Sequence, residues 1–154
     1  TTSQTIIGSW TYKGAASQFE SENLLAKAGG AAASSKINGE LEKIYAKIGF
    51  NTVKFTFNQD NTYTLALGKI TSKGTYTFDP QTKTITLKTK LGATLNANTV
   101  TLGNNMSILF NADKLMDALK SLTGMATKIN SNAATIAEVL KNYDGLKVGF
   151  ELIK

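Results

Sequence analysis

The chain contains no cysteine, no histidine and no arginine, and it has a single proline. These absences exclude a thiolate nucleophile, an imidazole base near neutral pH and a zinc site built from Cys or His. All 17 basic residues are lysine, so the guanidinium fork that holds phosphate or carboxylate at two points is missing as well. An enzyme would have to work with Lys, Tyr, Ser, Thr and 11 carboxylates. We therefore predict a protein that is not an enzyme and that uses no cofactor.

The chain carries a formal net charge of +6, which is compatible with a nucleic-acid partner. Its lysines, however, are scattered from Lys13 to Lys154 and form no block. Without Arg, neither base readout nor arginine stacking is available. A solvated, lysine-rich surface explains the charge better, so we predict no nucleic-acid partner. No stretch approaches the ~20 apolar residues of a membrane helix, so we also predict no transmembrane segment.

Apolar and polar residues alternate from residue 52 to residue 110, with turn-forming residues at each break. A period of two predicts strands with one buried and one solvated face. The expected strands cover residues 52–58, 62–68, 73–79, 82–90, 93–102 and 105–110. In the fifth of these, Leu95 and Ala97 have the opposite parity to Val100, which favours a bulge near Asn98.

Two further strands are expected near the ends of the chain, one from Ile6 to Gly14 and one over residues 146–153. Six consecutive antiparallel strands leave two open edges, and these two strands are what remains to seal them. We therefore predict one domain, residues 1–154, that is mainly β with helical insertions: an eight-stranded antiparallel β-barrel with a helical pair after strand one and another before strand eight. An outer-membrane barrel is the competing closure, but its strands need ~9–11 residues to span, and these strands are too short.

The first helical pair is expected between the first strand and residue 52. A capping box, Ser17 to Glu20, opens its first helix, and Gly29-Gly30 end it. The second helix ends at Gly49. Its apolar stripe consists of Ile37, Leu41, Ile44, Tyr45 and Ile48.

The second helical pair is expected between residues 113 and 143. Asn111 or Asp113 caps its first helix, which ends near Gly124, and Ser131 or Asn132 opens the next. Their apolar positions are Leu115, Met116, Leu119 and Leu122 in one helix and Ile136, Val139, Leu140 and Tyr143 in the other. A barrel needs only hairpins, so we interpret this long connection as a lid or a partner surface.

Six motifs together carry a family resemblance: Gly8-x-Trp10-x-Tyr12, Phe19-Glu20-Ser21, Ala28-Gly29-Gly30, Gly74–Asp79, Phe110–Leu115 and Tyr143–Phe150. Over nearly its whole length the chain resembles the secreted lipocalin-like proteins of unknown function found in Bacteroidetes. The resemblance implies a barrel and an exported protein of the periplasm, cell surface or extracellular space, and it brings no established activity. Since the chain begins at Thr1, we expect an upstream segment with a lipid anchor to have been removed. In true lipocalins, an Arg of the last strand usually stacks on the tryptophan of the first motif. Here Lys147 or Lys154 would have to take the position of that Arg.

Seven aromatic residues are expected to line the inside of the barrel: Trp10, Tyr12, Phe55, Phe57, Tyr63, Tyr76 and Phe78. Rings with hydroxyl or N–H groups are typical of a pocket for a small apolar or amphipathic ligand, which is the function we predict. An eight-stranded barrel is only just wide enough for one small ligand or for its own side chains. The alternative is therefore a filled barrel that acts as a structural or protein-interaction module of the cell envelope, with an exposed apolar patch.

The acidic residues offer weaker candidates. Asp113, Asp117 and Asp144 could hold a divalent cation through oxygen, but no EF-hand spacing is present, and caps or solvated faces explain them. Glu40 and Glu42 point to different sides of one helix and are poor partners for acid–base catalysis. We predict neither a metal site nor a catalytic pair.

Overall fold

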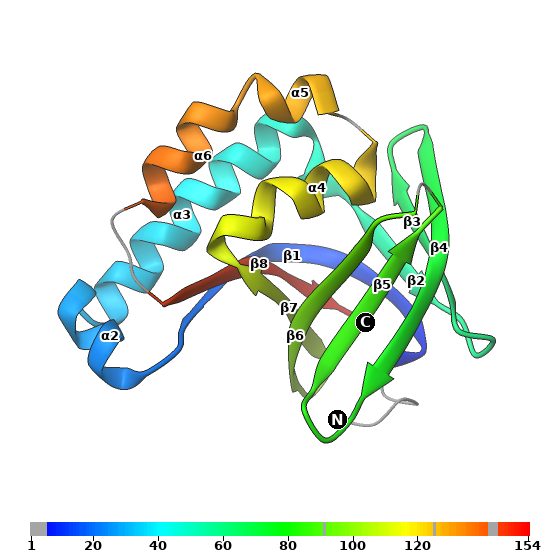
Figure 1. Cartoon of the computed structure of the whole chain (residues 1–154), viewed down its shortest axis with the longest axis horizontal. Helices are drawn as coiled ribbons and strands as arrows, with labels where there is room; N and C mark the ends of the chain where they lie inside the picture. The colour runs from blue at the N-terminus through cyan, green and yellow to red at the C-terminus, as the bar shows by residue number, and fades with distance from the viewer. Residues whose placement is uncertain (1–5, 91, 125, 142–144) are drawn as a thin grey trace.

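The predicted barrel is present, and it is closed. The structure is a computed structural model that describes residues 6–90, 92–124, 126–141 and 145–154. Its eight antiparallel strands pair in chain order, and the last pairs with the first. Their bounds are β1 Gly8–Phe19, β2 Lys54–Phe57, β3 Thr62–Leu67, β4 Ile70–Asp79, β5 Thr84–Thr89, β6 Thr94–Leu102, β7 Asn105–Asn111 and β8 Leu146–Ile153. Figure 1 shows the helices gathered on one side of the barrel.

The seam that closes the barrel lies between β1 and β8. Strand β1 pairs with β2 around Trp10 and with β8 from Thr11 to Phe19. The register with β8 shifts between Tyr12 and Gly14, an irregularity of the kind that bends a strand. The C-terminal strand therefore lies beside the Trp10 segment, as predicted, and the sheet has no open edge.

Strand β1 is longer than expected, and the predicted capping box is wrong. Ser17 lies within β1 opposite Val148, and its hydroxyl donates a hydrogen bond to Asn38 Oδ1 at 2.7 Å. Helix α2 (Glu22–Ala28) begins only after the strand has ended. Strand β8 provides backbone hydrogen-bond partners along the C-terminal half of β1. Together these bonds stabilise the strand more than one side-chain cap would stabilise a helix.

Strand β6 also departs from the expectation, because the predicted bulge near Asn98 is wrong. Its register with β5 ends at Asn98 and its register with β7 begins there, and neither register contains a shift. Thr99 points inward, with 1% of its surface exposed, and donates from Oγ1 to the carbonyl of Lys83 at 3.0 Å. Val100 and Leu102 are instead 46% and 79% exposed. A threonine can lie on the buried face when its hydroxyl is hydrogen-bonded. The alternation of polar and apolar residues therefore assigned Val100 and Leu102 to the wrong face of β6.

Helix α3 (Ala31–Ile48) confirms the predicted stripe. All five of its apolar residues are buried: Ile37, Leu41, Ile44, Tyr45 and Ile48. Gly49 ends the helix in the left-handed conformation, with a φ of 81°. The Tyr45 hydroxyl donates to the carbonyl of Gly149 in β8 at 2.8 Å and so ties the helix to the seam. A short 3-10 turn, η1 (Phe50–Thr52), leads from the helix towards β2.

The connection between β7 and β8 holds a 3-10 turn and three helices. They are η2 (Ala112–Lys114), α4 (Leu115–Thr123), α5 (Ala126–Asn130) and α6 (Ala133–Leu140). Helix α4 contacts β3, β4 and β7, and its residues Leu115, Leu119 and Leu122 are fully buried. It therefore covers part of the barrel and completes the core.

Details of this connection differ from the prediction. Helix α5 was not expected. The cap predicted at Asn111 is wrong, because Asn111 opens η2 without a side-chain bond, and Asp113 lies inside η2. Gly124 does end α4, with a φ of 70°. Tyr143 and Asp144 lie outside the described residues. Among the helices that the structure describes, none is long and apolar enough to cross a membrane.

Candidate functional site

The predicted interior rings are brought together, mostly in contact with one another. Trp10, Phe55, Phe57, Tyr63 and Tyr76 are buried, while Tyr12 and Phe78 are partly buried against the core. Phe57 lies 5.7 Å from Phe55 and 5.1 Å from Tyr76, measured between ring centroids. Phe150 of β8 stacks on Phe55 at 5.6 Å. Aromatic side chains thus occupy much of the barrel interior. That these stacked rings contact a ligand remains a prediction.

Two of the predicted residues have structural partners instead. The Trp10 N–H donates to the carbonyl of Ile6 at 2.8 Å, and Lys154 Nζ lies 5.3 Å from the Trp10 ring centroid. Lys154 therefore takes the place that the resemblance assigned to it or to Lys147. Tyr12 packs edge-on against Tyr45 of α3 at 6.1 Å. Burial, with a smaller contribution from the charge of Glu42, raises the pKa of Tyr12 to about 12.

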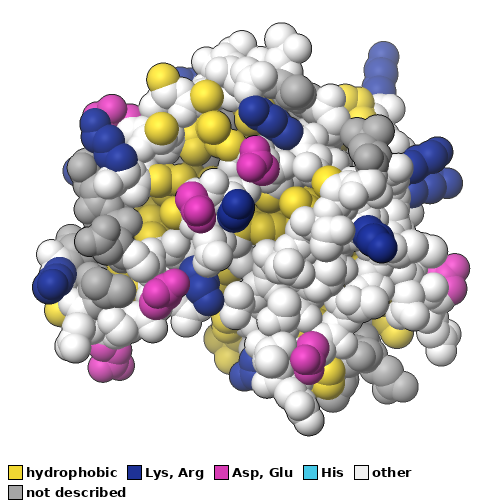
Figure 2. All heavy atoms as spheres, in the orientation of Figure 1, with side chains coloured by type: hydrophobic (Ala, Val, Ile, Leu, Met, Phe, Trp, Pro, Cys, Tyr) yellow, Lys and Arg dark blue, Asp and Glu magenta, His cyan; other side chains and the backbone are white. Residues whose placement is uncertain are grey.

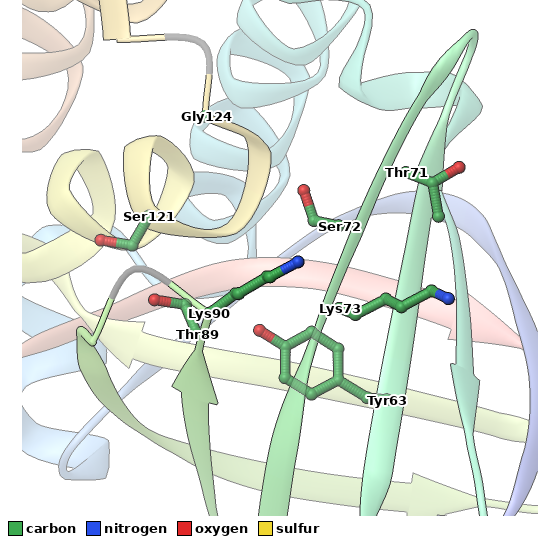
Figure 3. Close-up of a pocket in the computed structure, with 8 residues that line it drawn as sticks. All are labelled: Tyr63, Thr71, Ser72, Lys73, Thr89, Lys90, Ser121 and Gly124. Atoms are coloured by element: carbon green, nitrogen blue, oxygen red, sulfur yellow. The ribbon is translucent and has the colours of Figure 1, made fainter.

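A cavity of about 560 Å³ lies where the ends of β4 and β5 meet the C-terminal end of α4 (Figure 3). We call it the mouth cavity. It is lined by Tyr63, Thr71, Ser72, Lys73, Thr89, Lys90, Ser121 and Gly124. Of the seven predicted site residues, only Tyr63 takes part. Ligand pockets in proteins typically measure ~300–1,000 Å³, so this cavity has the size of a small-molecule site.

Tyr63 lines the mouth cavity as a buried residue with a free polar group. Its residue surface is 1% exposed, and its hydroxyl forms no hydrogen bond with any residue that the structure describes. Burial raises the pKa of Tyr63 to about 12, so the phenol stays protonated at neutral pH. The hydroxyl oxygen itself is accessible, because the Tyr12 hydroxyl is the only buried side-chain polar atom without a partner in the described part of the chain. The Tyr63 phenol therefore faces the open space of the cavity, where water or a ligand can be its partner.

Gly74 determines where the Tyr63 ring lies. It pairs with Tyr63 across β3 and β4, and a Cβ at Gly74 would lie 2.6 Å from Tyr63 Cε1 and 2.8 Å from Cζ. Real Cβ atoms do not approach other atoms so closely, so the ring occupies space that any other residue would fill. A glycine inside a strand often marks such a close approach. That signal in the sequence could have singled out Gly74 and its partner.

The rim of the mouth cavity is polar and positively charged. In Figure 3, the side chain of Lys90 extends between the Ser72 hydroxyl and the Tyr63 ring, whereas Thr71 and Lys73 extend the opposite way. Two of the lining residues are lysines, and none is acidic. Neither lysine forms an ion pair within the described part of the chain. The cavity therefore carries uncompensated positive charge.

A second hollow, of about 400 Å³, lies between α4 and α6 and is mainly apolar. Its lining is Ala112, Asp113, Met116, Ile136, Ala137, Leu140 and Lys141. Figure 2 shows hydrophobic side chains gathered in this region, with charged side chains around them. This surface belongs to the helices that we interpreted as a lid or a partner surface.

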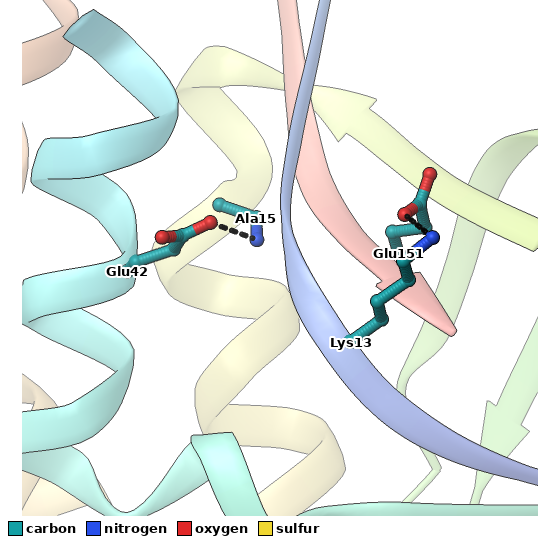
Figure 4. Close-up of polar contacts among 4 residues, drawn as sticks. All are labelled: Lys13, Ala15, Glu42 and Glu151. Atoms are coloured by element: carbon teal, nitrogen blue, oxygen red, sulfur yellow. Dashed lines mark hydrogen bonds and ion pairs between the residues drawn. The ribbon is translucent and has the colours of Figure 1, made fainter. Parts of the chain in front are cut away.

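The two acidic residues of α3 that we considered as a catalytic pair have structural partners instead. Glu42 Oε1 accepts from the Ala15 N–H at 3.3 Å, which fastens α3 to β1 (Figure 4). Glu40 pairs with Lys43 at 3.8 Å on the surface. Within the described ranges, no group of three metal-ligating side chains could hold an ion. Asp144, the third member of the cation cluster that we considered, lies outside these ranges.

Comparisons with known proteins were made over the whole chain. A family model described as "Lipocalin-like domain (DUF4923)" matches residues 1–154. No curated protein gives a significant match. Among solved structures, a DUF4847 family protein from Bacteroides vulgatus matches with a TM-score of 0.43 and 11% sequence identity, covering 97% of this chain and 93% of that one. Because the family match spans every residue, the chain belongs to the DUF4923 family of lipocalin-like domains.

Proposed function

We propose that the protein binds a small amphipathic ligand in the mouth cavity and catalyses no reaction. One observation carries the proposal: the hydroxyl of Tyr63, a residue that is 1% exposed, has no partner among the described residues and lines a cavity of about 560 Å³. The Tyr63 ring and the methyl and methylene groups of the Thr and Lys residues supply apolar contacts. The rim supplies hydroxyls and ammonium groups.

The ring packing supports a site at the mouth instead of one in the middle of the barrel. Phe57 contacts Tyr76 at 5.1 Å, and Phe55 contacts Phe150 at 5.6 Å. A ligand among these rings would have to separate them and disrupt the close packing of the core. The mouth cavity is instead open space that exists before a ligand arrives.

The chemistry of the lining supports binding without catalysis. A serine or threonine hydroxyl becomes a nucleophile when an adjacent base activates it, and no carboxylate lines the cavity. With a pKa of about 12, Tyr63 remains protonated and is a poor base at neutral pH. The cavity therefore offers groups that position a ligand, and it lacks a matched acid and base.

The experiment is a fluorescence titration with N-phenylnaphthylamine, an uncharged probe that brightens in apolar surroundings. We expect saturable binding at one site per chain. Ser121 lies in the cavity wall on α4, so Ser121→Trp should fill the cavity and reduce the affinity at least about tenfold. Thr135→Trp adds the same side chain to an exposed position on α6 and should leave binding unchanged. Equal binding by both variants would place the probe elsewhere and refute the proposal.

A second candidate function is that of a protein-interaction module. It is favoured by the apolar hollow between α4 and α6, in which Met116 and Ile136 take part. Ala137→Glu would place a charge in this hollow, and it should abolish partner binding while leaving the dye titration unchanged. We also propose that the protein works outside the cytoplasm in either role, which cell fractionation would test.

A further inference from the structure

We infer that the ligand carries an anionic oxygen group, such as a carboxylate, sulfonate or phosphate, which Tyr63 and Lys90 bind in the mouth cavity. The inference rests on the proposed function and adds the chemical class of the ligand. It depends on three features of the cavity: the hydrogen that the Tyr63 hydroxyl offers, the charge of the lining, and the position of Lys90.

The Tyr63 hydroxyl requires an acceptor. A phenol can donate or accept, but the raised pKa, about 12 because of burial, keeps its proton in place. Every other polar side-chain group of the lining is a hydroxyl or an ammonium, and an ammonium can only donate. A ligand group with several acceptor sites matches this set of donors better than a ligand group that donates. Gly74 fixes the ring that carries the hydroxyl, because no side chain fits beneath it.

The charges of the lining favour an anion. Lys90 contributes one full positive charge, without an ion pair in the described part of the chain and without an acidic neighbour in the lining. The C-terminal end of α4 opposes it, since a helix C-terminus carries about half a negative charge. One whole charge exceeds that half charge, so the net local charge is positive.

Lys90 is the lysine that can reach the ligand. Figure 3 shows its side chain ending between Ser72 and Tyr63, whereas Lys73 extends away on the other side of β4. The strand pattern agrees, because Lys73 is exposed next to the inward-facing Ser72. Lys90 and the Tyr63 hydroxyl would thus hold the same anionic group from two sides, with Ser72 as a third donor.

The test compares anilinonaphthalene sulfonate with N-phenylnaphthylamine, which has the same rings and no sulfonate. At low salt we expect the sulfonate to bind roughly tenfold more tightly, since a charge-assisted hydrogen bond contributes about that factor. Lys90→Ala and Tyr63→Phe should each weaken sulfonate binding more than they weaken binding of the neutral probe, and so remove most of this difference. Lys88→Ala removes an exposed lysine of β5 that does not line the cavity, and it should leave the difference intact.

Each outcome separates this inference from the proposed function. If both probes bind equally well at one site, the anion inference fails and the binding function stands. If neither probe binds, the proposed function itself fails. If Lys88→Ala weakens sulfonate binding as much as Lys90→Ala does, the sulfonate is responding to the general positive charge of the surface, and the assignment to Lys90 and Tyr63 is wrong. Circular dichroism on each variant establishes that it is folded.

Discussion

At the scale of single residues, the site depends on a glycine and a tyrosine that occupy paired positions. Gly74 lies opposite Tyr63 in the β3–β4 register, and its missing side chain leaves the space that the Tyr63 ring fills. The ring is held by this close approach of the two strands, so its position in the cavity wall is fixed. A rigid donor of this kind loses little entropy on binding.

Gly74→Ala should therefore damage both stability and binding. The added Cβ would lie nearest to the backbone carbonyl oxygen of Lys88 and 2.6 Å from the Tyr63 ring, and overpacking of this kind typically costs roughly 1–3 kcal/mol. Urea unfolding measures the loss, and the dye titration measures the displacement of the ring. Gly39→Ala is the matched control, because no atom lies within 4 Å of its new Cβ and alanine is favoured within α3, so it should be neutral or stabilising by up to about 1 kcal/mol.

The buried tyrosines predict a loss of stability in alkaline solution. Burial raises the pKa of Tyr12 and of Tyr63 from 10.0 to about 12, and it also raises the pKa of Tyr45. Between pH 10 and 12 the folded protein therefore keeps protons that the unfolded chain has lost. Stability that is fully present below pH 10 should fall as the pH rises through this window.

Urea midpoints measured between about pH 8 and about pH 11.5, on either side of the ordinary tyrosine pKa, would check the alkaline prediction, with Tyr63→Phe as the comparison. The variant lacks one of the shifted groups, so its midpoint should fall less steeply above pH 10. Parallel curves for the two proteins would show that Tyr63 ionises normally in the fold.

At the scale of elements, α3 is fastened to β1 where that strand is irregular. The register shift at Tyr12 and Gly14 turns the Ala15 N–H towards α3, where Glu42 accepts from it. Close by, Lys13 pairs with Glu151 of β8 at 3.4 Å, as Figure 4 shows. The irregular part of the seam is thus held from both sides.

Glu42→Ala should loosen α3 by about 0.5–1 kcal/mol, the contribution of an exposed charge-assisted hydrogen bond. It should also lower the pKa of Tyr12 from about 12, because the charge of Glu42 is the smaller of two causes that raise it. Urea unfolding and tyrosinate absorbance against pH measure these effects. As a control, Glu40→Ala removes a surface ion pair with Lys43 and should change the free energy of unfolding by less than about 0.5 kcal/mol. If Glu42→Ala and Glu40→Ala changed stability equally, Glu42 would have no specific role.

At the scale of the whole molecule, the helices after β7 form part of the core and are more than an added cover. Leu115, Leu119 and Leu122 of α4 are fully buried, in the same cluster as Phe150 and the other interior rings. The barrel and α4 therefore share one hydrophobic core. A lid, if this connection acts as one, would have to move without withdrawing these leucines.

Replacing residues 113–142 with a short Gly-Ser linker should abolish cooperative unfolding, because it exposes the apolar surface that α4 covers. Leu119→Ala tests the same point more gently and should cost about 2–5 kcal/mol in urea unfolding. A linker variant that unfolds at an unchanged urea concentration would show that these helices are dispensable to the fold.

The closed barrel and the buried face of α3 could be predicted because both follow from local periodicity. A period of two through residues 52–110 and a helical stripe ending at Gly49 each leave few alternatives for the face that is buried. The prediction failed where a distant partner outweighed the local signal. Ser17 joined β1 because β8 was available to it, and Thr99 turned inward because the carbonyl of Lys83 could accept its hydrogen bond.

The sequence by itself determined that eight strands would close and which helix face would be buried, since short-range patterns of apolar residues specify both. Only the tertiary structure decided that the interior rings would pack on one another and that the open space would lie at the mouth. Tyr63, Lys90 and Ser121 come from β3, from the end of β5 and from α4, and they line one cavity because of strand register and helix packing. No spacing along the chain encodes that meeting, because it depends on the free energy of the complete core.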